Sequence, residues 1–143
     1  MSPVLPVLID TSVWIEYFSP RPKISQETLS HLRQLILDDE VLIIDPIRAE
    51  LLSGQIRLSK HSELDRLLSS LTQIDLNWSL RETWDSLVKL ASDGISNRVP
   101  VPVPGLIDRM ILLSASRANV AICSLDQNLL KFARFLKINI YPL

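Results

Sequence analysis

Three short, uninterrupted runs of apolar residues stand out along the chain, at positions 7–9, 41–44 and 120–123, and a weaker fourth lies at 138–141. Apolar runs that do not alternate with polar residues are typical of strands buried on both faces of a parallel sheet. The pattern therefore predicts a mainly parallel central sheet of four to five strands.

The segments between these runs carry apolar residues at helical spacing, and most begin at a residue that caps or opens a helix. The predicted starting residues are Ser25, Asp45 with Pro46, Ser62, Ser79 with Glu82 as a capping box, Gly105 and Asp126. The helix from Ser25 is expected to reach about residue 38, and the last two helices to reach about residues 118 and 136. Gly54 and Gly94 stand where the helices from Asp45 and Ser79 should stop.

Strands that alternate with helices, without an internal repeat or a long linker, predict a single three-layer α/β/α domain over residues 1–143. The unusual segment is 99–104, in which three prolines alternate with valines. Such a segment forms neither a helix nor a central strand. We therefore expect a stiff extended loop that leads into the helix carrying Asp108.

Composition narrows the class of protein. The 143 residues are 47% hydrophobic and 22% charged, which is usual for a globular protein and unlike a disordered one. No apolar run approaches the roughly 18 residues of a membrane helix, and no secretory leader is recognisable. One cysteine and two histidines favour neither a disulfide framework nor a structural zinc site. A soluble, cytoplasmic protein without a membrane partner is expected.

The net charge of −1 conceals a gradient along the chain. Residues 1–94 carry nine basic and fourteen acidic side chains, a net charge of −5, whereas residues 95–143 carry six and two, a net charge of +4. Such an asymmetry is consistent with an ordinary solvated surface, or with a basic wall beside an acidic site. Charge alone leaves both interpretations open.

Four acidic residues follow the predicted strands or begin the helices beside them. Asp10 comes directly after the first apolar run, and Asp126 lies three residues beyond the third. Glu50 lies in the first turns of the helix after the second run, and Asp108 lies three residues into the helix that Gly105 starts. Because ligands of open α/β sheets bind beyond the carboxyl ends of the strands, these acids are candidate functional residues.

A single acid after a strand is commonly a helix cap or a turn former, and Asp45 keeps that interpretation. Asp126 is open to both interpretations. Several acids at one edge of a sheet are not explained by independent capping, because carboxylates brought together repel one another unless a cation neutralises them. Oxygen ligands without histidine or cysteine favour Mg²⁺ or Mn²⁺, and such a site suits phosphate chemistry.

Other solutions to phosphate or acyl chemistry are missing from the sequence. It contains no P-loop, no glycine-rich dinucleotide fingerprint and no nucleophile elbow, and it has only three glycines. His31 lies on the helix after Ser25, away from the four acids, so a histidine general base is not expected.

Four segments of the chain resemble the motifs of PIN-domain ribonucleases, in particular the VapC-type toxins of prokaryotic toxin–antitoxin pairs. The segments are VLIDTSVWI at 7–15, IRAELLSG at 47–54, DRMILLSAS at 108–116 and SLD at 124–126. They occur in the family's order and spacing, and they span nearly the whole chain. The sequence departs from the family at Leu112 and Leu113, where small residues are usual, and at Asn128, where a second acid is common.

The resemblance implies a PIN-like fold and an Mg²⁺-dependent endoribonuclease. Asp10 and Asp108 would be the main metal ligands. Glu50 and Asp126 would complete the acidic pocket directly or through water. The hydroxyl-bearing residues Thr11, Ser12 and Ser124 would orient the carboxylates or water from the second layer.

A metal-activated water would then attack an RNA phosphodiester, leaving a 5′-phosphate and a 3′-hydroxyl. The basic C-terminal third would grip the RNA backbone through Arg109, Arg117, Lys131 and Arg134. The family also implies a cognate small antitoxin, whose C-terminal segment covers the acidic groove, and a homodimer. The leucine-rich helices and the tryptophans Trp78 and Trp84 are candidates for these contacts, or simply for the core.

Two other functions fit the same fold. One is an Mg²⁺-dependent phosphotransfer domain of the receiver or phosphatase kind, although Asp10-Thr11-Ser12 lacks the second acid such domains carry. The other is a non-catalytic RNA-binding module, although such a surface has no need of clustered carboxylates. The aromatic residues Trp14, Tyr17 and Phe18 are open to two interpretations, base stacking and core packing.

Overall fold

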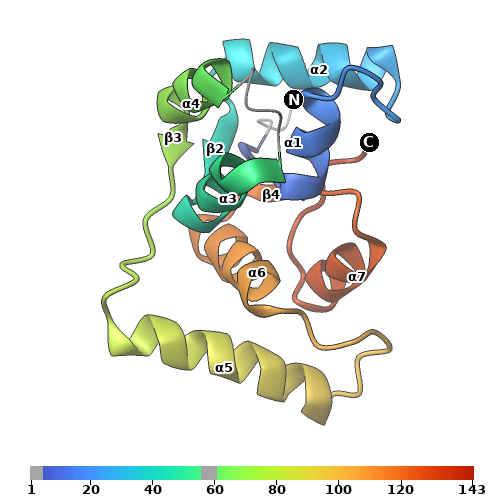
Figure 1. The fold of residues 1–143 in the computed structure, drawn as a ribbon. Helices are drawn as coiled ribbons and strands as arrows, with labels where there is room; N and C mark the ends of the chain where they lie inside the picture. Colours follow the sequence, from blue (N-terminus) through green and yellow to red (C-terminus); the bar gives the residue numbers. More distant parts are fainter. Residues whose placement is uncertain (1–4, 56–60) are drawn as a thin grey trace.

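The computed structural model describes residues 5–55 and 61–143 of the chain (Figure 1). Its strands are β1 (Val7–Ile9), β2 (Val41–Ile43), β3 (Thr72–Gln73) and β4 (Ala121–Cys123). Its helices are α1 (Thr11–Tyr17), α2 (Gln26–Leu37), α3 (Asp45–Glu50), α4 (His61–Ser70), α5 (Arg81–Ser96), α6 (Leu106–Ala118) and α7 (Gln127–Phe135), and a π-helical turn η1 (Leu51–Gln55) follows α3. The domain predicted over 1–143 includes residues 1–4 and 56–60, which lie outside the described residues, and it stays a prediction.

The sheet is parallel throughout, in the order β3-β2-β1-β4, which confirms the predicted parallel sheet. Val7, Leu8 and Ile9 of the central strand β1 are all almost completely buried, as an uninterrupted apolar run predicts. The fourth run forms only an isolated parallel bridge between Ile140 and Ile122, rather than a full strand. The sheet is completed by β3, which was not predicted, because its two residues are exposed and polar and no apolar run marks them.

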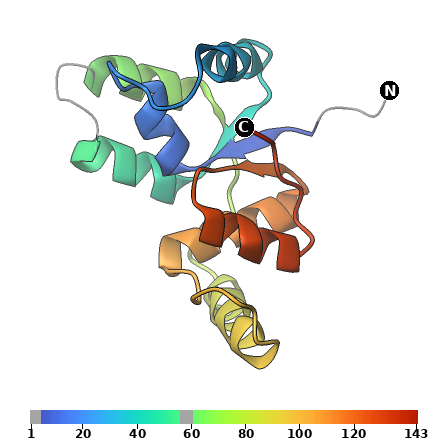
Figure 2. The ribbon, with the colours of Figure 1, turned by 90° about the vertical axis from the view of Figure 1, so that its right-hand side faces the viewer.

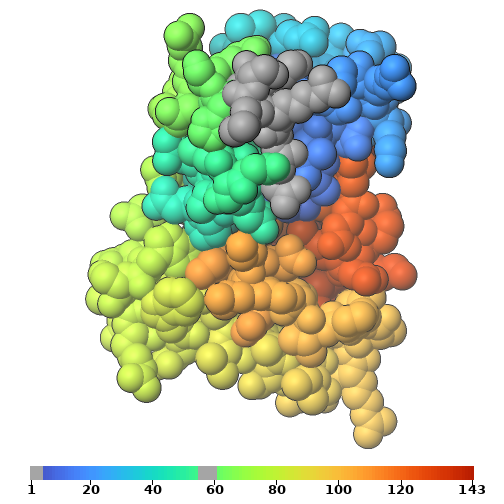
Figure 3. Space-filling model, in the orientation of Figure 1, coloured from blue at the N-terminus to red at the C-terminus, as the bar shows by residue number. Residues whose placement is uncertain are grey.

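The sheet lies between two layers of helices, so the three-layer α/β/α prediction is confirmed. Figure 2 shows α1, α2, α3 and α4 on one side of the sheet and α6 and α7 on the other. Helix α5 packs against α6 on the side away from the sheet. In the space-filling view α5 forms one end of the molecule (Figure 3). No helix of the described chain is long and apolar enough to cross a membrane.

Four of the predicted helix starts are confirmed and two are wrong. Ser25 caps α2 by accepting a hydrogen bond from the Thr28 amide at 3.1 Å, and Gly105 and Asp126 stand immediately before α6 and α7. Asp45 begins α3 as predicted, although the N-cap is Ile44. The wrong starts are Ser62, which follows the first described residue of α4, and Ser79, which precedes the N-cap Leu80 of α5. The Ser79 hydroxyl donates to the Asn77 side chain instead of capping α5.

The prediction that Gly94 ends its helix is wrong, because α5 continues to Ser96. A Cβ atom at Gly94 would lie 2.7 and 2.8 Å from two ring carbons of Phe132, and the Phe132 side chain is fully buried. Glycine is therefore required here by the close approach of α5 to α7 and not by a helix stop. Gly54 does stand at a break, with φ of 114° inside η1.

Candidate active site

The carboxyl ends of β1 and β4 meet at one edge of the sheet. Ile9 pairs with Cys123, so the next residues, Asp10 and Ser124, lie side by side. The Asp10 amide donates to the Cys123 carbonyl at 2.9 Å. Parallel pairing thus brings together two residues that are 114 positions apart in the sequence.

The Asp10 carboxylate is buried and held by two hydroxyl groups. Ser124 Oγ donates to Asp10 Oδ2 at 2.7 Å, and Ser12 Oγ donates to the same oxygen at 2.8 Å. The residue is only 6% exposed, and its other oxygen, Oδ1, accepts no hydrogen bond from the described residues. One oxygen therefore fixes the carboxylate, and the other remains available to a ligand.

Glu50 reaches the same edge from the end of α3. Thr11 Oγ1, at the first residue of α1, donates to Glu50 Oε2 at 2.5 Å. Thr11 and Ser12 therefore orient different carboxylates, although they are neighbours in the sequence: Thr11 binds Glu50 and Ser12 binds Asp10.

Asp126 caps a helix, which confirms one of its two predicted interpretations. Its Oδ1 atom caps α7 by accepting hydrogen bonds from the Asn128 and Leu129 amides, at 2.9 and 3.2 Å. Its own amide donates to Ser124 Oγ at 3.0 Å, so Ser124 connects Asp126 to Asp10. Capping occupies one carboxylate oxygen of Asp126 and leaves Oδ2 for other contacts.

Asp108 is the acid on which the charges of the others converge. Burial first, and then the negative charges of Asp10, Asp126 and Glu50, raise the pKa of Asp108 from 3.8 to about 6. Asp108 lies in the first turn of α6, and within the described chain its side chain accepts no hydrogen bond and forms no ion pair. The structure therefore brings the other three predicted acids within electrostatic reach of Asp108.

The donor groups suit a hard cation that keeps part of its water. In residues 5–55 and 61–143, no three acidic, histidine or cysteine side chains form a shell that could hold a metal ion. Mg²⁺ is usually held by one or two carboxylates together with several waters, so it does not need such a shell. Within the described residues, hydrogen bonds leave Asp10 Oδ1, Glu50 Oε1, Asp126 Oδ2 and both oxygens of Asp108 available.

The cysteine Cys123 lies beside the acidic site. Cys123 lies immediately before Ser124 and is fully buried. Burial first, and then the charge of Asp10, raise the pKa of the Cys123 thiol to about 12. The thiolate is the reactive form of cysteine, so Cys123 is a packing residue and not a nucleophile.

The four basic residues predicted to bind RNA have different surroundings. Arg109 donates to the backbone carbonyls of Pro104 and Leu87, at 3.1 and 2.9 Å, and Arg117 donates to Ser86 Oγ at 2.9 Å. These two side chains tie α6 to α5 and to the preceding proline-rich loop. The other two, Lys131 and Arg134, are exposed on α7, and each lacks a hydrogen-bond or salt-bridge partner within the described chain.

The aromatic residues after Asp10 belong to the core. Trp14 is fully buried and Phe18 is 8% exposed, and their rings pack with each other and with Tyr17. A fully buried ring has no face to offer to a base, so the core interpretation is correct for Trp14. Leu112 and Leu113 are likewise buried, and the departure from the family's small residues there concerns packing.

The fold and the acidic edge define a class of protein: an α/β domain whose parallel sheet ends in a cluster of carboxylates suited to a divalent cation. The chain belongs to the PIN domain family, because that family's model matches residues 7–135.

Named relatives and solved structures are similar to this chain. VapC ribonuclease Mb1587 of Mycobacterium bovis and ribonuclease VapC11 of Mycobacterium tuberculosis are each 32% identical to it over 73 residues, which are 50% of this chain and 52% of the relative. The chain thus matches about half the length of these curated relatives. FitAcB from Neisseria gonorrhoeae has a TM-score of 0.66 at 18% identity, covering 95% of this chain and 96% of that one. FitAB bound to an IR36 DNA fragment has a TM-score of 0.67 at 16% identity, covering 94% and 93%.

The raised pKa of Asp108 predicts how pH changes stability when no metal is present. Folding raises this pKa from 3.8 to about 6, so the folded protein binds the proton more tightly than the unfolded chain. The free energy of unfolding should therefore fall as pH rises through that window. Because Asp108 is partly exposed to solvent, we expect a loss of only about 1 kcal/mol.

The measurement is the melting temperature from pH 4 to pH 7 in EDTA, compared between the wild type and Asp108→Asn. Other groups titrate in both proteins, so the difference between the two curves isolates Asp108. The variant should gain stability relative to the wild type as pH rises. Parallel curves would contradict the prediction.

Proposed function

We propose that this chain is an Mg²⁺-dependent endoribonuclease and the toxin of a toxin–antitoxin pair. The observation that carries the proposal is that Asp10, Glu50 and Asp126 lie close enough to the partly buried Asp108 for their charges to add to burial in raising its pKa. Mutual repulsion of this kind is costly unless a cation neutralises it. Membership of the PIN domain family and the relatives named as ribonucleases support RNA as the substrate.

Each residue of the site has a separate task in this proposal. Asp10, oriented by the hydroxyls of Ser12 and Ser124, and Asp108 would hold the cation directly. Glu50, oriented by Thr11, and Asp126 would hold its water molecules. When bound, Mg²⁺ or Mn²⁺ neutralises the phosphate, polarises phosphorus and makes a bound water more acidic. Residues of the outer layer matter because they fix the direction in which each carboxylate points.

Lys131 and Arg134 are the basic residues best placed to bind the RNA backbone. Both are exposed on α7, the helix that Asp126 caps. Arg109 and Arg117 already donate hydrogen bonds within the protein, so their role in this proposal is to position α6 and with it Asp108.

Metal removal tests the proposed reaction. The purified protein should cleave structured RNA in Mg²⁺ or Mn²⁺, leave 5′-phosphate ends and lose all activity in EDTA. Excess Mg²⁺ should restore the activity, because EDTA removes the ion without changing any residue of the site. Cleavage that survives EDTA, or products with 2′,3′-cyclic phosphate ends, would overturn the metal-dependent mechanism. Intact RNA under all these conditions would overturn the nuclease function itself.

Two protein partners complete the proposal. A small antitoxin would cover the acidic groove with its C-terminal segment and place a basic residue among the carboxylates, as the VapC-type resemblance implies. A second copy of the chain would pack on α5, where Leu80, Trp84, Val88 and Ile95 form an exposed apolar stripe on one face. Their spacing keeps them within about 80° around the helix axis, and α5 forms one end of the molecule (Figure 3).

We expect this chain to act in the cytoplasm.

A further inference from the structure

A cavity lies directly beside the candidate active site, between α7 and the segment that follows it. Its volume is ≈ 360 Å³, within the range of small-molecule sites. The walls include Gln127, Leu130 and Arg134 of α7 on one side, and Ile140 and Tyr141 on the other. The proposed catalytic mechanism uses none of these five residues except Arg134.

The cavity and the acidic site share one residue. Ser124 lines the cavity, and its hydroxyl donates to Asp10 Oδ2 at 2.7 Å. A phosphate held at Asp10 would therefore have its own nucleoside, or the adjacent one, at the mouth of the cavity. No acidic side chain lines the cavity in the described part of the chain, in contrast to the site beside it.

The chemistry of the walls matches an unpaired nucleobase. Single-stranded RNA is recognised by stacking bases on aromatic rings or arginine planes and by hydrogen bonds to base edges. Tyr141 and Arg134 supply the stacking groups, Leu130 and Ile140 supply apolar surface, and the amide of Gln127 supplies both a donor and an acceptor.

Backbone pairing fixes the wall that carries Tyr141. The Tyr141 amide donates to the Ile122 carbonyl at 2.8 Å, and the Ile122 amide donates to the Asn139 carbonyl at 2.9 Å. The segment thus lies against β4, the strand that ends at Cys123, directly before Ser124. A wall fixed in this way needs little ordering when a ligand binds, which favours affinity.

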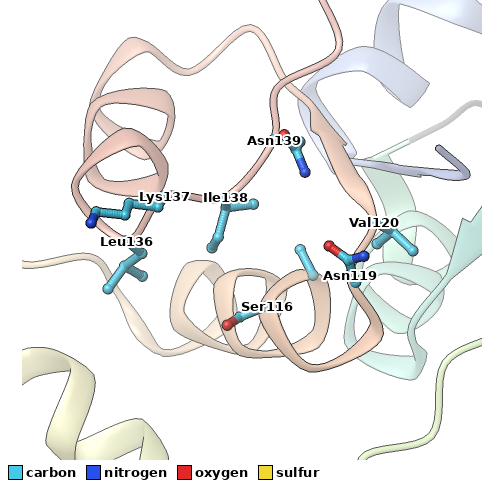
Figure 4. A pocket seen from close by; sticks show the side chains of 8 residues that line it. Ser116, Asn119, Val120, Leu136, Lys137, Ile138 and Asn139 are labelled. Carbon is cyan, nitrogen blue, oxygen red and sulfur yellow. The ribbon is translucent and has the colours of Figure 1, made fainter. Parts of the chain in front are cut away.

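The cavity at the opposite end of β4 does not suit a base. It lies between the end of α6 and the residues after α7, where it is lined by Asn119, Val120 and Lys137 among others (Figure 4). Its volume is ≈ 60 Å³, enough for a few waters but not for a nucleotide. It is also remote from the carboxyl ends of the strands, where the acids gather.

We propose that the cavity formed by Tyr141, Arg134 and Gln127 is a base-binding subsite, which receives one unpaired base of the RNA next to the phosphate held at the acidic site. This inference rests on the proposed ribonuclease function. The subsite would make cleavage sensitive to the identity of one nucleotide beside the cut, while α7 binds the backbone without regard to sequence.

Binding and cleavage are measured separately to test this. Fluorescein-labelled octamers of oligo-A, oligo-C, oligo-G and oligo-U RNA, and their copies with one abasic nucleotide, are titrated in Mg²⁺ against the full chain carrying Asp108→Asn. Tyr141→Ala added to this background should weaken binding of the preferred octamer about tenfold. Tyr141→Phe should change it less than about twofold because it keeps the ring. The three proteins, which are Asp108→Asn alone and with Tyr141→Ala or Tyr141→Phe, should bind the weakest-binding abasic octamer with equal affinity, because it lacks the base that the subsite receives.

Arg134→Gln provides a second variant at an exposed position, where folding is not at risk. Its matched control is Lys137→Gln, which removes the same charge beside the other cavity. Arg134→Gln should weaken binding of the intact octamer more than binding of its abasic copy, and Lys137→Gln should leave both unchanged. In the otherwise wild-type protein, sequencing the 5′ ends of a cleaved random RNA pool should show a base preference at one position, which Tyr141→Ala abolishes while raising KM more than it lowers kcat.

The outcomes separate the two proposals. Equal binding by the tyrosine, phenylalanine and alanine proteins, or failure of every octamer to bind, overturns the base-binding subsite. Cleavage that continues with an unaltered base preference in Tyr141→Ala also overturns it and leaves the ribonuclease function intact. The expected binding pattern without any cleavage by the wild type supports the subsite and overturns the nuclease function.

Discussion

Asp10→Asn and Asp108→Asn are each expected to lower Mg²⁺-dependent RNA cleavage at least about 100-fold. Removing partners that only orient a metal ligand typically costs 10- to 100-fold, and we expect the direct ligands to matter more. Asparagine keeps the size of aspartate but removes the negative charge that a cation needs. Initial rates on one structured RNA, at saturating Mg²⁺, measure the effect.

The two variants differ in stability, and this difference excludes unfolding as the cause of lost activity. Asp108→Asn removes a charge that burial and three neighbouring carboxylates oppose, so the variant should melt at the wild-type temperature or above it in EDTA. Asp10→Asn places an amide where two hydroxyls donate to a carboxylate oxygen, so it should melt lower. Loss of activity in both variants, with opposite changes in melting temperature, identifies a chemical role.

Asp85→Asn is the matched control. Asp85 lies on the exposed surface of α5, where its only partner in the described chain is the neighbouring Arg81. The same chemical change there should leave cleavage within about twofold of the wild type, since exposed ion pairs contribute little. If Asp85→Asn were as inactive as Asp108→Asn, net charge rather than the acidic site would explain the effect. Wild-type rates in Asp108→Asn would remove this residue from the proposed metal ligands.

The sequence predicted those strands of the sheet that are buried, because buried strands consist of apolar residues. β1, β2 and β4 are buried apolar runs, and each was predicted. β3 contains only the exposed residues Thr72 and Gln73, and it pairs because β2 presents a free edge to it. Helix α1 was missed because it has only seven residues and its N-cap, Asp10, makes no side-chain capping bond. The Asp10 carboxylate instead accepts hydrogen bonds from the hydroxyls of Ser12 and Ser124.

Part of the candidate site could likewise be predicted from the sequence, and part could not. The four acids were predictable because each follows a strand or starts a helix at the same edge of a parallel sheet. The pairing of each hydroxyl with its acid was not predictable, since the hydrogen bond from Thr11 to Glu50 depends on how α1 packs beside α3. Tyr141 lies in the weak fourth apolar run, but no motif marked it as a site residue, because its place beside Ser124 results from the pairing of residues 139–141 with β4.

Ser124→Ala is the second change with a large expected effect, both on stability and on activity. The Ser124 hydroxyl donates to the buried Asp10 carboxylate at 2.7 Å and accepts from the Asp126 amide at 3.0 Å. Removing it leaves a buried charged oxygen with one donor instead of two. A hydrogen bond to a charged group contributes about 1.5–3 kcal/mol, so unfolding free energy should fall by about 2 kcal/mol. Cleavage should fall about 10- to 100-fold because the direction of Asp10 is less fixed.

Ser114→Ala is the control, because it also removes a buried serine hydroxyl but leaves the Ser124 hydroxyl in place. Ser114 is also fully buried, but its hydroxyl donates only to the Met110 carbonyl one turn earlier in α6. That carbonyl keeps its helical partner, so the change should cost less than about 1 kcal/mol and leave cleavage unchanged. Urea unfolding and initial rates for the two alanine variants give both quantities. Equal losses of activity in the two variants would mean that Ser124 acts only through the core, whereas a loss confined to Ser124→Ala places it among the residues that position Asp10.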